Sequence, residues 1–343
     1  MVKAIGMFSG GLDSSVAIRV IREQGIEVIA LHFESPFCAC QDKGCTVKEV
    51  ARELGVQLKL VPEGMDFVNV VRKPKHGYGS AINPCIDCRI RRLRQAKKIA
   101  RKIGADFIFT GEVLGQRPMS QHSRAMKTIE REAGLEGKLL RPLSAKLMPE
   151  TEAEKKGFVD RGKLLSISGR RRVEQAALAK KYGITKNSSP GGGCPLTEKD
   201  FAAKLRDLFC HKKRIDVQDV VILRYGRHFR IGKNKIVVGR NKRDNEMILM
   251  LKKKADYALE VPNTGSPITI LQGPKTRGAI DAAASLTARY SDSEGESVLV
   301  EYWKTKGEKR KRTEIAPAND EFCKKNMLTG PGQDGKFKNM QAS

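Results

Sequence analysis

Met7-Phe8-Ser9-Gly10-Gly11-Leu12-Asp13-Ser14-Ser15 is the stretch that decides the expected fold of the first half of the chain. The apolar run 2–8 is typical of a buried parallel strand, and the pattern after the stretch, which ends at Gly25, is typical of a helix. The loop between them has two glycines, which let a ligand come close to the backbone. Free N–H groups at a helix start favour an anion. The loop is therefore predicted to hold a phosphate or pyrophosphate.

Two well-known phosphate-binding loops do not fit this stretch. It is not a Walker A loop, because no Gly-Lys-Ser/Thr follows the glycines, and it lacks the Gly-x-Gly-x-x-Gly of the dinucleotide fingerprint. The plain alternative is a Gly/Ser turn that binds nothing. The nucleotide-binding candidates in the loop are Ser9, Gly10, Gly11, Asp13, Ser14 and Ser15.

Two later strands are expected to extend this site. Residues 27–33 and 105–110 are predicted as strands of a doubly wound parallel sheet, whose carboxyl ends face the nucleotide crevice. The pair His32-Phe33 is placed to meet the adenine, with core packing as the alternative. A glycine after a strand permits close approach of a ligand. Gly111 and Gln116 are therefore predicted to form a second half of the phosphate site.

The composition favours a cytoplasmic protein with a polyanionic partner. The chain has 343 residues, 40% of them hydrophobic, and a formal net charge of +26. Its length suggests two or three domains. No apolar run is long enough to cross a bilayer, and no signal peptide is expected. Such a basic chain favours nucleic acid over a membrane, although an organism-wide basic composition is the bland alternative.

Eight cysteines point to metal or sulfur chemistry, because a disulfide framework is not expected in a cytosolic chain. Cys85 and Cys88 precede a basic helix predicted over 89–103. A thiolate there is expected to have a lowered pKa and to be nucleophilic, although two thiols at this spacing could also chelate a metal. Cys194 follows three glycines, which favours a reactive thiol. The loop thiols, either metal-binding or free, are Cys38, Cys40 and Cys45.

The predicted helix 89–103 carries eight cations and no acid. Like charges on one helix repel each other, so a phosphate-binding face is favoured over a solvated surface. Its candidate RNA contacts are Arg89, Arg92 and Lys97. The basic, turn-rich loop 73–79 could contact phosphates or could equally be a solvated loop.

Four features in this order resemble the PP-loop tRNA thiolation enzymes, the 2-thiouridylases MnmA and the 4-thiouridine synthetases. They are the glycine loop, Asn83-Pro84-Cys85-Ile86-Asp87-Cys88, Thr110-Gly111 and the distant Cys194. The resemblance covers roughly residues 1–209 and implies an adenine nucleotide alpha hydrolase-like fold. It implies that ATP adenylates a uracil carbonyl oxygen, O2 or O4, in tRNA and that sulfur then replaces the adenylate. The catalytic residues that it implies are Cys85, Cys88, Cys194 and Asp13, the last as a residue that orients Mg²⁺.

The resemblance leaves two routes for the sulfur. It arrives either as a cysteine persulfide, from a cysteine desulfurase or sulfide, or on a [4Fe–4S] cluster held by Cys85, Cys88 and Cys194. A CxxC pair with one remote cysteine favours the cluster. The rival functions are a PP-loop amide ligase, which has no need of these thiols, and a non-catalytic RNA-binding protein.

The pattern changes after Asp216. Short strands are predicted at 217–225, 229–231 and 235–238, followed by a helix at 278–290. Gly239-Arg240-Asn241, Asp244-Asn245-Glu246 and the later Ala-Ala-x-Leu-x-Ala-x-Tyr-Ser pattern resemble the RNA-binding NFACT-R domain, with a generic α+β appendage as the alternative. The RNA contacts that follow from this resemblance are Arg240 and, in the basic run 304–312, Arg310.

The expected architecture is α/β, a doubly wound parallel sheet with a smaller α+β domain at the C-terminus. Its expected parts are an ATP-binding domain at 1–165, a helical segment with the remote cysteine at 166–215, an RNA-binding domain at 216–320 and a disordered tail at 321–343. tRNA is the expected partner, together with the sulfur donor and a second copy of the chain as a homodimer.

Overall fold

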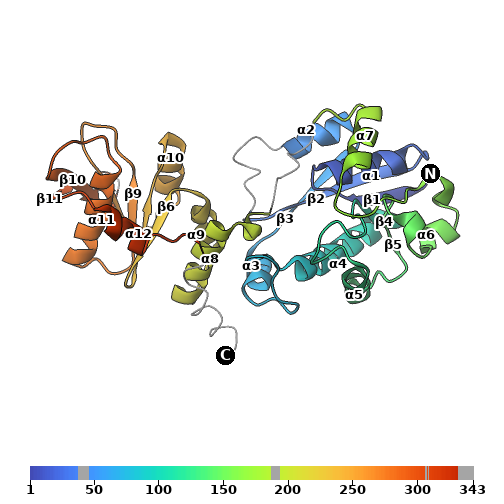
Figure 1. Cartoon of the computed structure of the whole chain (residues 1–343), viewed down its shortest axis with the longest axis horizontal. Helices are drawn as coiled ribbons and strands as arrows, with labels where there is room; N and C mark the ends of the chain where they lie inside the picture. The colour runs from blue at the N-terminus through green and yellow to red at the C-terminus, as the bar shows by residue number, and fades with distance from the viewer. Residues whose placement is uncertain (38–45, 187–193, 306, 308, 331–343) are drawn as a thin grey trace. The chain divides into compact units, whose positions relative to one another are not determined.

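The computed structural model describes residues 1–37, 46–186, 194–305, 307 and 309–330 (Figure 1). The chain divides into two compact units, Met1–Thr197 and Glu198–Ser343. Each unit has its own sheet and its own buried core. In the described part of the chain, no helix is both long enough and apolar enough to span a membrane.

The first unit is built on a five-stranded parallel sheet in the order β3-β2-β1-β4-β5. Its strands are β1 (Lys3–Met7), β2 (Glu27–Glu34), β3 (Gln57–Pro62), β4 (Phe107–Thr110) and β5 (Leu139–Leu140). Its helices are α1 (Leu12–Arg22), α2 (Thr46–Glu53), α3 (Met65–Arg72), α4 (Cys85–Ile103), α5 (Ser123–Ala133), α6 (Glu152–Lys155) and α7 (Val173–Lys181). The predicted doubly wound α/β fold is confirmed.

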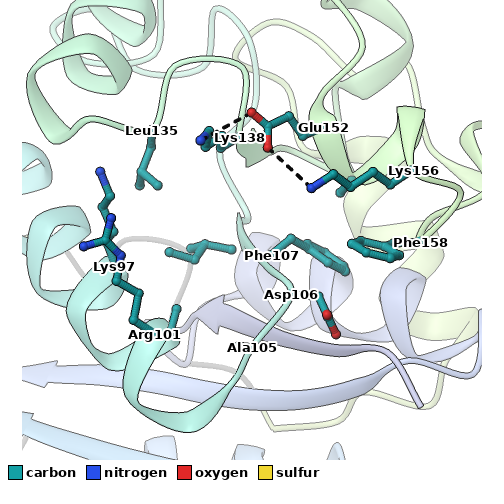
Figure 2. Close-up of a pocket in the computed structure, with 13 residues that line it drawn as sticks. Lys97, Arg101, Ala105, Asp106, Phe107, Leu135, Lys138, Glu152, Lys156 and Phe158 are labelled. Carbon is teal, nitrogen blue, oxygen red and sulfur yellow. Dashed lines mark ion pairs between the residues drawn. The ribbon is translucent and has the colours of Figure 1, made fainter.

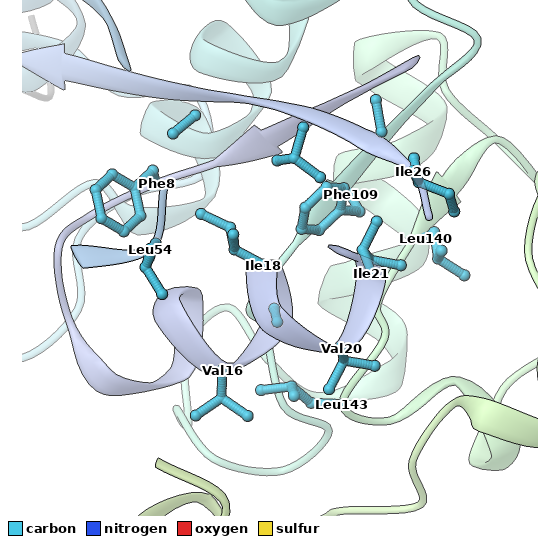
Figure 3. Close-up of a cluster of buried hydrophobic side chains, with 14 of the residues drawn as sticks. Phe8, Val16, Ile18, Val20, Ile21, Ile26, Leu54, Phe109, Leu140 and Leu143 are labelled. Carbon is cyan, nitrogen blue, oxygen red and sulfur yellow. The ribbon is translucent and has the colours of Figure 1, made fainter. Parts of the chain in front are cut away.

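Apolar side chains pack on both faces of this sheet because successive strand residues point to opposite sides. In β1, Ala4 joins the core under α1, whereas Ile5 joins the core under α4 and α5. Figure 3 shows the first of these cores, where Ile18 and Ile21 of α1 lie against Phe109 of β4. Burying both faces fixes the sheet between two helical layers and leaves its carboxyl edge for the loops.

The second unit carries a six-stranded antiparallel sheet in the order β11-β10-β8-β9-β7-β6. Its strands are β6 (Arg227–Ile231), β7 (Asn234–Val238), β8 (Tyr257–Glu260), β9 (Thr269–Gln272), β10 (Val298–Trp303) and β11 (Lys311–Ile315). Its helices are α8 (Lys199–His211), α9 (Val217–Val221), α10 (Lys242–Met250), α11 (Arg277–Arg289) and α12 (Asp320–Asn326). Helix α11 covers one face, and α10 packs on part of the other.

Two sequence-based expectations for this unit are wrong. Residues 217–225 were expected as a strand, but they form α9 and a 3-10 turn, because Asp216 and Asp219 cap the helix reciprocally. Residues 321–329 were expected in a disordered tail, but most of them lie in α12, and Leu328 N donates to His228 O at 2.8 Å. Both segments are anchored by backbone hydrogen bonds that a hydropathy pattern does not reveal.

Candidate active site

The glycine loop is shaped by its own hydroxyl groups. The hydroxyls of Ser14 and Ser15 donate to the carbonyl oxygen of Gly11 at 2.9 and 3.0 Å. The Ser9 and Ser14 hydroxyls lie 3.1 Å apart. Gly10 has a φ of +74°, which favours glycine at this turn. The loop thus enters α1 in a fixed conformation, with the positive end of the helix dipole behind it.

Gly111 lies directly against this loop. A Cβ atom added at Gly111 would stand 2.6 Å from the Cα of Ser14 and 2.7 Å from the carbonyl carbon of Asp13. The side chain of Gln116 reaches the same place, where its Nε2 donates to Oδ1 of Asp13 at 3.3 Å. The structure therefore brings Gly111, Gln116 and Asp13 together at the carboxyl edge of the sheet.

One cationic side chain at this edge of the sheet, that of Arg172, was not predicted from the sequence. Nη2 of Arg172 lies 3.6 Å from Oδ2 of Asp13. The segment before α7 is brought there because Ser168 forms a parallel bridge with Leu114, and Gly169 N donates to Leu114 O at 2.7 Å. The available signal was the run Ser168-Gly169-Arg170-Arg171-Arg172, three consecutive cations after a glycine.

His32 and Phe33 are more than nine-tenths buried, as core packing requires. Nδ1 of His32 lies 2.9 Å from the carbonyl oxygen of Phe8, so the tautomer with a proton on Nδ1 donates there. Burial lowers the pKa of His32, which keeps the ring neutral. The ring of Phe33 packs against the guanidinium of Arg92, 5.6 Å from its Cζ. Adenine contact by this pair stays a prediction.

The thiols of Cys85 and Cys88 lie in the first turn of α4, which begins at Cys85. Nδ2 of Asn83 lies 3.1 Å from the sulfur of Cys85. The segment of Cys194 is brought to this region by a backbone hydrogen bond, from Ile82 N to Leu196 O at 3.0 Å. Cys194 is exposed, whereas the other two thiols are half-buried.

The expectation of a lowered pKa at Cys88 is wrong. Burial raises the pKa of the Cys88 thiol, and the opposing effect of Arg92 and Arg89 does not overcome it. Although solvent reaches Cys194, enough protein surrounds it to raise the pKa of its thiol to about 11. The neighbouring thiols of Cys88 and Cys85 also raise that pKa. The three sulfurs are thus close enough to influence one another electrostatically.

A buried ion-pair network connects the thiols to the glycine loop. Arg89, the residue after Cys88, pairs with Glu112, which follows Gly111 in the chain. Oε2 of Glu112 also accepts from Nε of Arg141 at 3.0 Å. Burial by itself would raise the pKa of Glu112, but Arg89 and Arg141 hold it below its usual value. The carboxylate therefore stays charged, and it joins two parts of one edge.

Several cations of α4 are held by partners from other segments of the first unit. Arg91 and Arg92 both pair with the buried carboxylate of Glu63, at 2.6 Å each. Arg94 Nε donates to the carbonyl oxygen of Glu132, and Lys97 Nζ donates to that of Gly134. In the second unit, Arg240 pairs with Asp244, and Arg310 pairs with Glu260 and Glu301. The predicted RNA contacts thus all have intramolecular partners, and their role stays a prediction.

The described residues do not form a ready metal centre. Among them, no group of three or more His, Cys, Asp or Glu side chains is arranged to hold a metal ion. Cys85, Cys88 and Cys194 are thus not arranged as a metal-binding group in this structure, and the iron–sulfur cluster stays a prediction. Cys38, Cys40 and Cys45, for which metal binding was one alternative, lie outside the described residues, as do the three glycines before Cys194.

A hollow of about 240 Å³ lies at the opposite, amino-terminal end of β4 (Figure 2). Phe107 and Phe158 line it, with Lys97 and Arg101 on one side. Lys138 and Lys156 flank Glu152 on another, both in ion pairs with it. This hollow contains none of the residues of the glycine loop or the cysteines, so it is separate from the candidate active site.

Two protein families match separate parts of the chain. Residues 2–146 match the family described as thiamine biosynthesis protein (ThiI), and residues 226–327 match the NFACT protein RNA binding domain. The predicted resemblance to PP-loop tRNA thiolation enzymes, with an NFACT-type domain after them, is confirmed at this level.

Curated relatives match about a third of the chain. A tRNA-specific 2-thiouridylase MnmA from Pelobacter propionicus is 33% identical over 110 residues, 30% of this chain and 31% of the relative. A probable tRNA sulfurtransferase from Thermococcus kodakarensis is 29% identical over 123 residues, 33% of this chain and 30% of the relative. The chain thus spans about a third of the length of these relatives.

The chain is also similar to solved structures. A 4-thiouridine synthetase, solved as an RNA complex with bound ATP, is 23% identical and has a TM-score of 0.38, covering 56% of this chain and 45% of that one.

Proposed function

We propose that this chain is an ATP-dependent tRNA sulfurtransferase, which adenylates a uridine carbonyl oxygen and replaces it with sulfur. One observation carries the proposal. The Arg89–Glu112 pair joins the Cys88 turn to Gly111, which packs on the glycine loop, so both halves of the chemistry share one edge of the sheet. The site is expected to act in the cytoplasm.

In the first step, the uridine oxygen attacks the α-phosphorus of ATP, and pyrophosphate leaves. The loop N–H groups and the helix dipole of α1 would stabilise the leaving pyrophosphate, as at other helix N-termini. Arg172 is close enough to Asp13 to add a positive charge there. Mg²⁺, when bound, offsets the phosphate charge, and Asp13 is the residue that would orient it.

In the second step, anionic sulfur attacks the activated ring carbon, and AMP leaves. A persulfide on one cysteine supplies this sulfur, whose outer atom forms the bond to carbon. A second thiol of the group Cys85, Cys88 and Cys194 then attacks the remaining sulfur–sulfur bond, which leaves a protein disulfide for a thiol reductant to cleave. The persulfide itself comes from a cysteine desulfurase or from sulfide with an oxidant.

The deciding experiment measures the nucleosides of tRNA. Mass spectrometry of tRNA from a deletion strain is expected to show the loss of one thiouridine, whose identity distinguishes O2 from O4. The intact gene should restore it, and Asp13→Ala and Cys88→Ser should not. Cys210→Ser, a thiol in the second unit, serves as the matched control and should restore it. An unchanged nucleoside profile in the deletion strain would overturn the proposal.

The two rival activities give different results in the same assays. A PP-loop amide ligase would keep its ATP-dependent activity when Cys85, Cys88 and Cys194 are all changed to serine. A non-catalytic RNA-binding protein would release no pyrophosphate in the presence of tRNA. The cluster stays a prediction of the resemblance, and anaerobic purification tests it, because an active protein without iron or visible absorption removes it.

A further inference from the structure

The second unit presents a charged face on the side of its sheet opposite α11. Strand residues alternate in direction, so Val298, Val300 and Tyr302 of β10 pack towards α11, whereas Glu301 and Trp303 point the other way. Register places Glu260 of β8 and Arg312 of β11 beside Glu301 on this same side. Side chains of three neighbouring strands therefore form one surface.

Trp303 is the apolar centre of this surface. Its ring packs at the edge of the cluster formed by Ala258, Leu251 and Ile270, and it stays partly exposed. The guanidinium of Arg310 lies over the ring, with its Cζ 4.2 Å from the ring centroid. Arg310 retains 44% of its side-chain exposure. A planar cation thus covers the indole while its own side chain stays partly open to solvent.

Two carboxylates hold the guanidinium in this position. Nη1 of Arg310 lies 3.1 Å from Oε2 of Glu301 and also pairs with Glu260. Arg312 pairs with the other oxygen of Glu301 at 2.9 Å. An arginine that is already fixed by an aromatic ring and two acids loses little conformational entropy when a second planar group stacks on it.

We propose that the Trp303–Arg310 stack is a platform for an unpaired base of the RNA substrate. Arginine planes and aromatic rings are the groups on which proteins stack splayed-out RNA bases. The flanking cations would contact the neighbouring phosphates, and they are exposed: Lys304, Lys309 and Arg312. Together with Arg310 these cations outnumber the carboxylates of this side, which are Glu260, Glu301 and Glu314, so the surface fits a polyanion. This inference rests on the proposed tRNA substrate. It adds the surface of the protein's second unit on which an unpaired base of that tRNA would stack.

The chain provides its own reporter, because Trp303 is its only tryptophan. Titration of the full chain with a tRNA transcript is expected to change tryptophan fluorescence saturably, at the concentrations where filter binding measures the complex. An RNA hairpin with an unpaired loop should give the same change, and a blunt duplex of the same length should not. Fluorescence that stays constant while filter binding shows a complex would overturn the platform.

A variant that keeps the charge tests whether the planar guanidinium of Arg310 is needed for stacking. Arg310→Lys keeps the positive charge but lacks the stacking plane, and it should weaken binding of the hairpin by about tenfold. Arg289→Lys on α11 is the control, because Arg289 is also 44% exposed and is also held by an ion pair, with Asp320. It should bind as the unchanged chain does. Equal affinity for both variants overturns the inference, whereas a chain that binds no RNA at all overturns the proposed function.

Discussion

Arg172 Nη2 lies 3.6 Å from Asp13 Oδ2, across a sequence separation that joins the start of α7 to the start of α1. The contact places a cation from the far end of the first unit beside the loop that is proposed to hold pyrophosphate. Asp13 also accepts from Gln116 at 3.3 Å, so its two oxygens are held by different elements. The position of the Asp13 carboxylate in the glycine loop therefore depends on residues far from it in the sequence.

Arg172→Ala is expected to lower kcat/KM for ATP by about ten- to a hundredfold, because a charge-assisted contact to phosphate would be lost. Arg172→Lys should recover part of this, since it keeps the charge. Pyrophosphate release with saturating tRNA measures the effect. Arg131→Ala, an exposed arginine on α5, is the control. If Arg172→Ala leaves the ATP dependence as it is, Arg172 is a packing residue only.

Gly111→Ala is expected to abolish ATP binding. The added methyl group would stand 2.6 to 2.7 Å from backbone atoms of Asp13 and Ser14, and backbone cannot move aside as a flexible side chain can. Overpacking of this kind costs about 1–3 kcal/mol of unfolding free energy. Gly278→Ala in α11 is the control, since its methyl group would meet nothing within 4 Å. Calorimetric ATP binding by a folded Gly111→Ala protein would contradict the close approach.

Cys194 is expected to react slowly with alkylating reagents despite its exposure. Its pKa is raised to about 11, so its thiolate fraction near neutral pH is about a hundredfold smaller than that of an ordinary thiol. Its alkylation rate, followed by mass spectrometry, should therefore keep rising with pH up to that value. A rate that levels off at the pKa of free cysteine would show that the surrounding protein does not suppress the thiolate.

The second unit is expected to lose stability in mild acid because of His228. Burial holds the pKa of this ring well below its usual value, and Lys204 and Lys235 lower it further. The unfolded state binds a proton below about pH 6.5 while the folded state does not, so stability falls by up to about 1.4 kcal/mol per pH unit. Urea unfolding followed by Trp303 fluorescence measures this. His228→Gln should flatten the dependence between about pH 6.5 and 5, and an unchanged slope would contradict it.

The sequence predicted the elements whose signal is local. Gly10 and Gly11 between a strand and a helix, the apolar strands on either side of β1 and the helix end at Gly104 are all visible in the pattern. Long-range electrostatics were not visible. Arg89, Arg91 and Arg92 of α4 looked unpaired because their acids come from other segments and meet them only after folding. Those acids are Glu63 and Glu112.

The cysteines show the same limit. The helix was predicted to begin after Cys88, at residue 89, whereas α4 begins at Cys85 and includes both thiols. The spacing of the two cysteines also could not tell how deeply this turn is buried. Burial of that turn is the reason why the pKa of Cys88 is raised and not lowered.

Arg172 was missed because three arginines in a row resemble a solvated surface. Only the bridge between Ser168 and Leu114 shows that this segment lies at the carboxyl edge of the sheet.

The position of the Glu112 carboxylate bears on how the two proposed steps, adenylation and sulfur transfer, could be coordinated. Glu112 directly follows Gly111, which packs on the glycine loop, and its carboxylate pairs with Arg89, the residue after Cys88. Under the proposed function, a shift of that loop on nucleotide binding would therefore reach the first turn of α4 through the Arg89–Glu112 ion pair. The cysteines of that turn would then respond to the nucleotide without touching its phosphates.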